Sequence, residues 1–168
     1  TYCDIPEAVR LTITEKPVLR FYSISDIHVG NDYWPEIPIN RNRAMEDIQR
    51  MSPDFVAING DLVDHGIQAE YDDLENFLQT NFNDEGIPAF IVNGNHELFN
   101  INYQHSNYDL EALLNAYDAQ LSKLSENPNI SISREEGFLY YCATFKDRKL
   151  IFVSAPEVSG TTATYTLS

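Results

Sequence analysis

The sequence predicts an α/β fold built on a parallel β-α-β-α-β core, and three observations support this prediction. Short runs suited to core strands recur at residues 18–25, 55–58 and 89–92, and the second of them is an apolar run typical of a buried strand. Amphipathic helical patterns fill the two intervals between these runs. Each run ends in a cluster of polar, titratable residues, and open α/β sheets place their ligand sites at the carboxyl ends of such strands.

A single domain over residues 1–168 accounts for the length and composition. The chain is 43% hydrophobic, which suffices for a substantial core. Its net charge of -15 repels nucleic-acid backbones and anionic membranes, so we expect neither as a partner. No apolar run approaches the roughly 18 residues of a membrane span, and no signal peptide is apparent, although the chain begins at Thr1. Cys3 and Cys142 can pair or remain free thiols, so the cellular compartment stays unknown.

The elements around the first core strand follow from periodicity and turn residues. Residues 8–14 alternate between apolar and polar, as a half-buried edge strand does. Residues 30–40 hold two prolines, so we expect a loop there. Asn40 is expected to cap a helix over residues 41–51.

The remaining elements are predicted in the same way. Apolar residues at helical spacing predict a second helix over residues 68–82. Asp109 is expected to cap a third helix, which the Asn-Pro pair at 127–128 ends. Residues 138–145 and 149–153, joined by a short charged turn, are typical of a β-hairpin.

The spacing of the polar clusters indicates that the three strand ends meet. Asp61 follows Asp26 by 35 positions, and Asn95 follows Asp61 by 34. A βαβ unit needs roughly 30 residues or more, and its parallel strands end at the same edge of the sheet. We therefore expect these side chains to lie close together.

The residue types in these clusters suit a metal centre. Asp26 and His28 are two apart in an extended segment, so they point to the same side and can hold one metal ion jointly. Asp61 follows Gly60, which lets the backbone turn sharply, and one carboxylate can bridge two cations about 3.5–4 Å apart. Asn95 offers a neutral amide oxygen. Mixed imidazole, carboxylate and amide ligands suit Mn, Fe or Zn better than Ca.

Three short motifs, one at the end of each predicted strand, carry a resemblance to a known family. They are, in chain order, Asp26-x-His28, Gly60-Asp61-x-x-Asp64 and Gly94-Asn95-His96-Glu97. In this order and spacing they closely resemble the first three motifs of the calcineurin-like metallophosphoesterases. The resemblance spans about residues 18–155. It implies the N-terminal portion of the family's αββα sandwich: a parallel β-α-β-α-β core with flanking helices and a β-hairpin.

The resemblance implies a metal-dependent hydrolase of phosphoesters, a phosphatase or a phosphodiesterase. Asp26 and His28 would ligate a first metal ion, Asp61 would bridge it to a second, and Asn95 would ligate the second. The implied cofactors are thus two divalent or trivalent ions of Mn, Fe or Zn, which would activate a hydroxide for in-line attack on a small phosphoester.

The same resemblance implies two catalytic residues. His96 would lie over the substrate phosphate and protonate the leaving oxygen or stabilise charge, with Asp64 holding its imidazole. His65 stands where the family's protein serine/threonine phosphatases have an arginine. This difference removes a bidentate phosphate contact and argues against that subclass.

A second departure concerns the later part of the family's motif set. Family members carry further metal-ligating histidines, including a Gly-His-x-His near the C-terminus, whereas this sequence has four histidines and none after His105. We therefore expect the N-terminal part of a longer metallophosphoesterase, whose missing half would complete the site. The alternative is a non-catalytic or incomplete metal- or phosphate-binding fragment.

A simpler alternative treats the motif residues as local structure. Asp26, Asp61 and Asn95 could be helix caps or turn formers, because aspartate and asparagine are common in both roles. That alternative explains any one of them but not three matching strand ends. Substrate identity, metal identity and oligomeric state are not determined by the sequence.

Overall fold

A computed structural model describes residues 19–31, 33–97, 109–135 and 139–153. In chain order its elements are β1 (Phe21–Ile24), α1 (Glu36–Met51), β2 (Phe55–Asn59), α2 (Gln68–Leu78), the π-helical turn η2 (Gln79–Asn83), β3 (Ala89–Val92), α3 (Leu110–Ser125), β4 (Ile130–Ser133), β5 (Tyr141–Phe145) and β6 (Arg148–Phe152).

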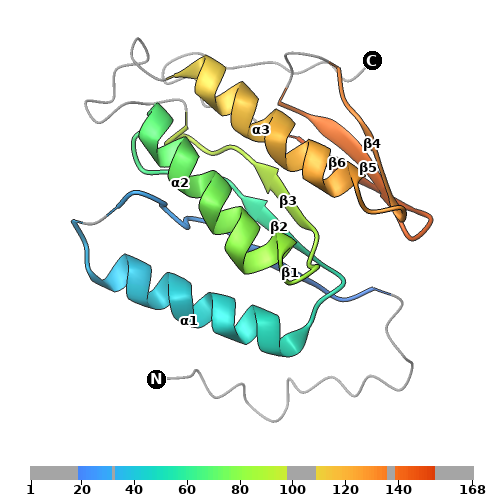
Figure 1. The fold of residues 1–168 in the computed structure, drawn as a ribbon, viewed down its shortest axis with the longest axis horizontal. Coiled ribbons are helices and arrows are strands. Elements are labelled where there is room, and N and C mark those ends of the chain that lie inside the picture. Colours follow the sequence, from blue (N-terminus) through green and yellow to red (C-terminus); the bar gives the residue numbers. More distant parts are fainter. Residues whose placement is uncertain (1–18, 32, 98–108, 136–138, 154–168) are drawn as a thin grey trace, which may run out of the picture.

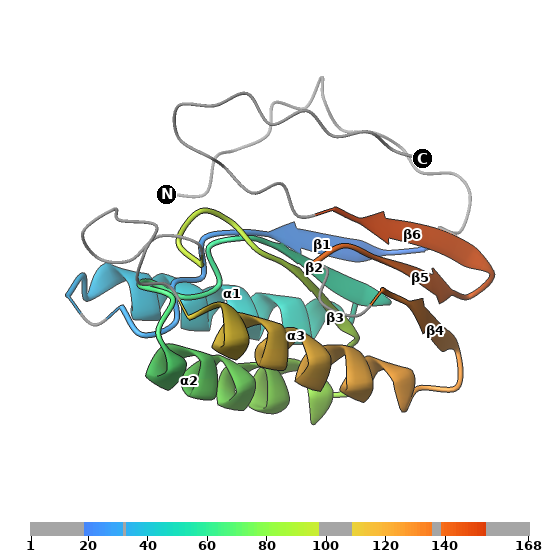
Figure 2. The ribbon, with the colours of Figure 1, turned by 90° about the horizontal axis from the view of Figure 1, so that it is seen from above.

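The elements form two layers, with the three α-helices on one side of two sheets (Figure 1 and Figure 2). One sheet is parallel in the order β1-β2-β3, and the other is antiparallel in the order β4-β5-β6. The segments that join the parallel strands contain α1 and α2. The predicted α/β fold with a parallel β-α-β-α-β core and flanking helices is confirmed.

Strand β3 is buried in the core and contacts the second sheet. All four of its residues are buried, as are the first four residues of β2. The Phe90 ring meets Phe55 edge-on at 5.5 Å between centroids and stacks on Phe152 of β6 at 4.9 Å. The Tyr141 hydroxyl of β5 donates a hydrogen bond to the Ile91 carbonyl of β3 at 2.9 Å. These contacts give the parallel strands a rigid support from which their loops project.

Helix α1 begins earlier than predicted. It starts at Glu36, so the C-terminal half of the expected 30–40 loop is helical and Asn40 is not its cap. Pro35 occupies the N-cap and Pro38 lies in the first turn. Backbone N–H groups in the first turn have no intrahelical partner, so proline is tolerated there and does not exclude a helix.

Helix α2 ends earlier than predicted, at Leu78, and continues as η2. The Asp84 N–H donates to the Gln79 carbonyl five residues before it, at 2.9 Å. This widened turn places Phe82 in the core, with none of its surface exposed. The helical pattern over residues 68–82 therefore marks buried positions correctly although the backbone changes type.

The C-terminal predictions hold with one addition. Asp109 caps α3, since its carboxylate accepts the Ala112 N–H at 2.9 Å. β5 and β6 form the predicted hairpin, and the turn residues Lys146 and Asp147 both have positive φ, as a two-residue hairpin turn requires. β4 was not predicted, because its four residues Ile-Ser-Ile-Ser give too short a pattern.

Two further observations complete the fold. The predicted edge strand at residues 8–14 and His105 lie outside the described residues.

In the described ranges no helix has both the length and the apolar character needed to cross a membrane.

Candidate metal centre

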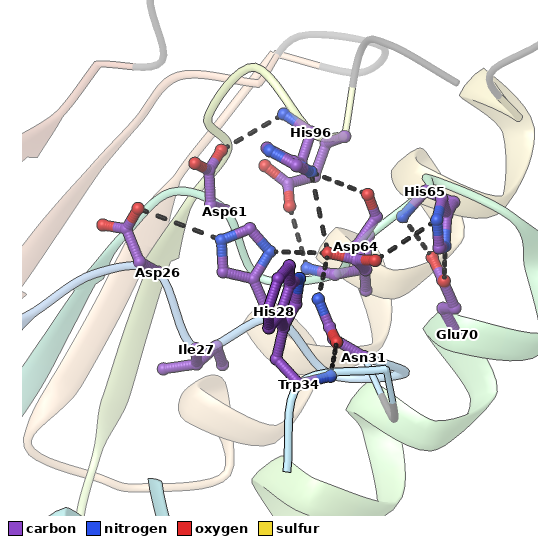
Figure 3. Close-up of polar contacts among 12 residues, drawn as sticks. Asp26, Ile27, His28, Asn31, Trp34, Asp61, Asp64, His65, Glu70 and His96 are labelled. Atoms are coloured by element: carbon purple, nitrogen blue, oxygen red, sulfur yellow. Dashed lines mark hydrogen bonds and ion pairs between the residues drawn. The ribbon is translucent and has the colours of Figure 1, made fainter. Parts of the chain in front are cut away.

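The loops that follow the three parallel strands run side by side at one edge of the sheet (Figure 3). After β1, the Asp26 N–H donates to the Gly60 carbonyl at 3.1 Å, and the His28 N–H donates to the Asp61 carbonyl at 3.0 Å. The parallel pairing resumes briefly where Val29 bridges Val63. The first two motifs are thus aligned by main-chain hydrogen bonds beyond the ends of their strands.

Two glycines allow the second and third loops to approach closely. A Cβ added to Gly60 would lie 2.7 Å from the Cα of Gly94, and one added to Gly94 would overlap the Asp61 carboxylate and lie 2.6 Å from its backbone nitrogen. Gly60 also has a φ of +86°, which favours glycine. The glycines before Asp61 and Asn95 are therefore required by the space between the loops.

Three of the predicted metal ligands have strained backbones. Asp26, His28 and Asp61 have φ values of 57°, 42° and 50°, in the left-handed region. This conformation costs about 1–2 kcal/mol for a residue with a side chain, and it persists only where the surrounding structure imposes it. Such strain clusters at functional sites, and here it occurs in the backbone of residues that the sequence predicts as metal ligands.

The side chains of this edge converge. One ligand atom each from His28, Asp61 and His96 lies within 4.8 Å of the others. Asp26 Oδ1 lies 3.9 Å from His28 Nε2. Asn95 stands beside His96 in the loop after β3 and is partly buried. The structure thus places all the predicted ligands on one set of loops and adds His96, predicted as a catalytic residue, to the close group.

Asp64 holds both of these histidines. Its carboxylate Oδ1 accepts a hydrogen bond from His28 Nδ1 at 3.0 Å, and its main-chain carbonyl accepts one from His96 Nδ1 at 2.7 Å. The predicted link from the Asp64 carboxylate to His96 is longer, at 4.0 Å. Because Nδ1 donates in both rings, the lone pair of each neutral imidazole lies on Nε2, the atom left for a metal or a substrate.

Asn31 is a contributor that sequence reasoning missed. Its amide donates to Asp64 Oδ1 at 2.9 Å, and its carbonyl oxygen accepts the Trp34 N–H at 3.2 Å. Only 8% of its surface is exposed. A polar residue three positions after His28 was its only signal, and it fell within a segment predicted as loop.

Glu97 fastens the second and third loops together. Its side chain is fully buried, and its carboxylate accepts the Val63 N–H at 3.0 Å and the Gly94 N–H. Burial raises the pKa of Glu97, while the two backbone hydrogen bonds oppose that rise. Glu97 acts as an internal acceptor that fixes the loops carrying Asp61 and His96.

The donor set fits a transition-metal ion. Imidazole nitrogens and carboxylate oxygens together suit Mn, Fe or Zn. A cation among Asp26, Asp61 and Asp64 would also offset the repulsion between neighbouring carboxylates. The Asp26 side chain is 64% exposed, so an ion and a ligand can reach the group from solvent.

A comparison with protein families identifies the family of this chain. A family model described as calcineurin-like phosphoesterase matches residues 19–155, a range that contains all three motifs. No match to a curated protein was found. The match covers most of the chain and confirms the resemblance carried by the motifs, so this chain belongs to the calcineurin-like phosphoesterase family.

Proposed function

We propose that this protein is a metal-dependent hydrolase of phosphate monoesters or diesters. The observation that carries the proposal is the group formed by His28, Asp61 and His96, whose ligand atoms lie within 4.8 Å of one another at the carboxyl edge of a parallel sheet. Membership of the phosphoesterase family supports the reaction type. The net charge of -15 favours a small phosphoester over a nucleic acid as substrate.

For the metal-binding residues we propose the roles that the family resemblance implies. Asp26 and His28 would hold one ion, Asp61 would bridge to a second, and Asn95 would contribute to the second. When bound, the ions would lower the pKa of a water ligand to about 7 and offset the charge on the phosphoryl oxygens. The loop glycines and Glu97 keep these donors at fixed positions.

His96 is proposed to act on the leaving group. The Asp64 carbonyl fixes its Nδ1, so its Nε2 can exchange a proton with a substrate oxygen. The ring is 30% exposed and meets the His28 ring edge-on, with 4.5 Å between centroids. It therefore borders both the proposed metal ligands and the solvent from which a substrate arrives.

A metal- or phosphate-binding role without turnover is the second candidate. Within the described ranges, one group of histidine and acidic side chains, formed by His28, Asp61 and His96, is close enough to hold a metal ion. Three ligand atoms suit one ion better than they suit two ions. We propose that ligands outside the described residues complete a second metal position in the active protein. Without them, the chain would hold one ion weakly.

Hydrolysis of two synthetic substrates tests the proposed function. We expect p-nitrophenyl phosphate or bis(p-nitrophenyl) phosphate to be hydrolysed with added Mn²⁺, and Asp61→Asn to reduce the rate at least about 100-fold. Asp73→Asn, the same change on the exposed face of α2, should leave the rate unchanged. Metal-independent hydrolysis that survives Asp61→Asn would contradict the proposal.

Metal stoichiometry separates the two candidates. Elemental analysis after equilibration with Mn, Fe or Zn should give close to two ions per chain if the site is complete. One ion or fewer, weakly held and without hydrolysis of either substrate, would favour the binding role.

A further inference from the structure

The partly exposed His65 and the buried Glu70 form a pair beside the candidate metal centre (Figure 3). The Glu70 carboxylate accepts two hydrogen bonds from His65: Oε1 accepts from ring Nδ1 and Oε2 accepts from the backbone N–H, both at 2.7 Å. The Glu70 side chain is only 7% exposed. A buried carboxylate needs hydrogen-bond partners to offset its desolvation, and here both partners belong to His65, so the two side chains hold each other in place.

The other ring nitrogen of His65 faces the metal centre. Its Nε2 lies 3.2 Å from Asp64 Oδ2. Both ring nitrogens therefore face carboxylate oxygens, so the His65 imidazole lies between Glu70 and Asp64 and links the two side chains.

Asp64 transmits this contact to a proposed metal ligand. With Oδ2 paired to His65, Oδ1 is turned toward His28 Nδ1 at 3.0 Å and toward the Asn31 amide at 2.9 Å. The proton on Nδ1 leaves the lone pair of His28 on Nε2, which faces Asp26 at 3.9 Å. The four residues thus form a continuous row in the order Glu70, His65, Asp64 and His28.

The neighbouring backbone makes room for this row. A Cβ on Gly30 would lie 2.6 Å from Glu70 Cγ, and Gly30 has a φ of +91°. The loop that carries His28 therefore closes over the Glu70 side chain without a side chain of its own at that point.

We propose that His65 and Glu70 are positioning residues of the metal centre, which hold the Asp64 carboxylate against His28 and so fix Nε2 of His28 as its metal-binding atom. The inference rests on the proposed metal site. It concerns which ring nitrogen of His28 carries the proton, a property that can be measured in the metal-free chain. Outer partners of metal-ligating histidines orient the ring and set its tautomer, and their removal typically lowers metal affinity about 10–100-fold.

Nitrogen-15 NMR of the histidine rings in the metal-free chain tests this inference directly. Long-range proton–nitrogen correlations report which ring nitrogen carries the proton, and with four histidines in the sequence the His28 signals can be assigned by substitution. We expect a single Nδ1–H tautomer of His28 in the native chain. Glu70→Gln and His65→Ala should each give a mixture of tautomers.

Calorimetric titration with Zn²⁺ gives a second readout on the same variants. We expect Glu70→Gln and His65→Ala each to weaken binding about 10-fold or more. Glu75→Gln makes the same chemical change on an exposed face of α2 and should alter neither readout. Backbone amide spectra verify the fold, and His65→Gln replaces His65→Ala if the latter does not fold.

The outcomes distinguish this inference from the proposed function. Retention of the Nδ1 proton on His28 and of native Zn²⁺ affinity in both folded variants would overturn the positioning role. A shifted tautomer and weakened binding support it even if neither synthetic phosphoester is hydrolysed, in which case the proposed function alone fails.

Discussion

The two ends of the parallel sheet place aspartates in opposite electrostatic settings. At the start of β2, Asp54 pairs with the Lys146 ammonium of the hairpin turn and accepts the Arg20 N–H at 2.7 Å. The lysine contact first, and then the arginine N–H, hold the pKa of Asp54 below its usual value. At the other end, the carboxylates of Asp26 and Asp64 lie beside histidine rings.

This difference separates a structural role from a chemical one. A carboxylate neutralised by a lysine has its charge offset and joins two parts of the fold. A carboxylate beside imidazole rings adds its oxygens to their nitrogens as donor atoms in a site for a cation. Aspartate thus has a structural role at one end of the sheet and a chemical role at the other, and the side chains next to it determine which role it has.

The largest expected effect concerns turnover at the carboxyl end. His96→Ala should lower the hydrolysis rate about 10²–10⁴-fold, because it removes the group proposed to exchange a proton with the leaving oxygen. Metal affinity should be largely retained, as measured by titration with Mn²⁺. A loss of affinity as great as that of Asp61→Asn would instead make His96 a metal ligand, in keeping with its place in the close group.

Next in size is the difference between two aspartates at this same end. Asp61→Asn should reduce metal affinity more than 100-fold, and Asp64→Asn about 10–100-fold, because Asp61 is the proposed bridge and Asp64 acts through His28. Parallel calorimetric titrations measure both. Equal affinity in the two variants would contradict the assignment of bridge and support.

Gly94→Ala tests whether the packing of the loops sets the site. The added methyl would overlap the Asp61 carboxylate, so we expect a loss of about 1–3 kcal/mol in unfolding free energy together with weakened metal binding. Gly86→Ala is the matched control. Gly86 has a φ of +68° and nothing within 4 Å of an added Cβ, so the control should strain the backbone and leave metal binding unchanged.

The smallest expected effect lies at the opposite end of the sheet. Asp54→Asn should cost about 0.5–1 kcal/mol at neutral pH, the range of a partly exposed ion pair. Since folding lowers the pKa of Asp54, its contribution is present above the ordinary value of 3.8 and disappears as the pH falls through the folded value. Denaturant unfolding of both proteins should therefore show their difference shrinking below about pH 4, with metal affinity equal throughout.

The sequence was sufficient to predict the features that depend on local pattern and on strand ends. The buried runs at residues 55–58 and 89–92 stand out by composition, and the Asp109 cap by its position before a periodic helix. Parallel strands bring their carboxyl ends together whatever their side chains. For this reason Asp26, Asp61 and His96 could be assigned to one place before their geometry was known.

Other features depend on contacts that leave no periodic pattern in the sequence. The pairing of His65 with Glu70, and of Asn31 with Asp64, has no periodic signal, because each depends on how loops fold over one another. The early start of α1 was hidden by Pro38, which reads as a helix breaker except within a first turn. The four-residue strand β4 is defined by its pairing with β5 more than by its own pattern.

The left-handed conformations of Asp26, His28 and Asp61 have a consequence for the metal-free chain. Each costs about 1–2 kcal/mol, and the cost is carried by the folding of the whole domain, before any ion arrives. The ligand loops should therefore keep their shape in the apo protein, and an incoming ion would lose little affinity to ordering of the chain. Metal would then act on stability only by mass action, adding about 2.7 kcal/mol at a hundredfold excess over its Kd.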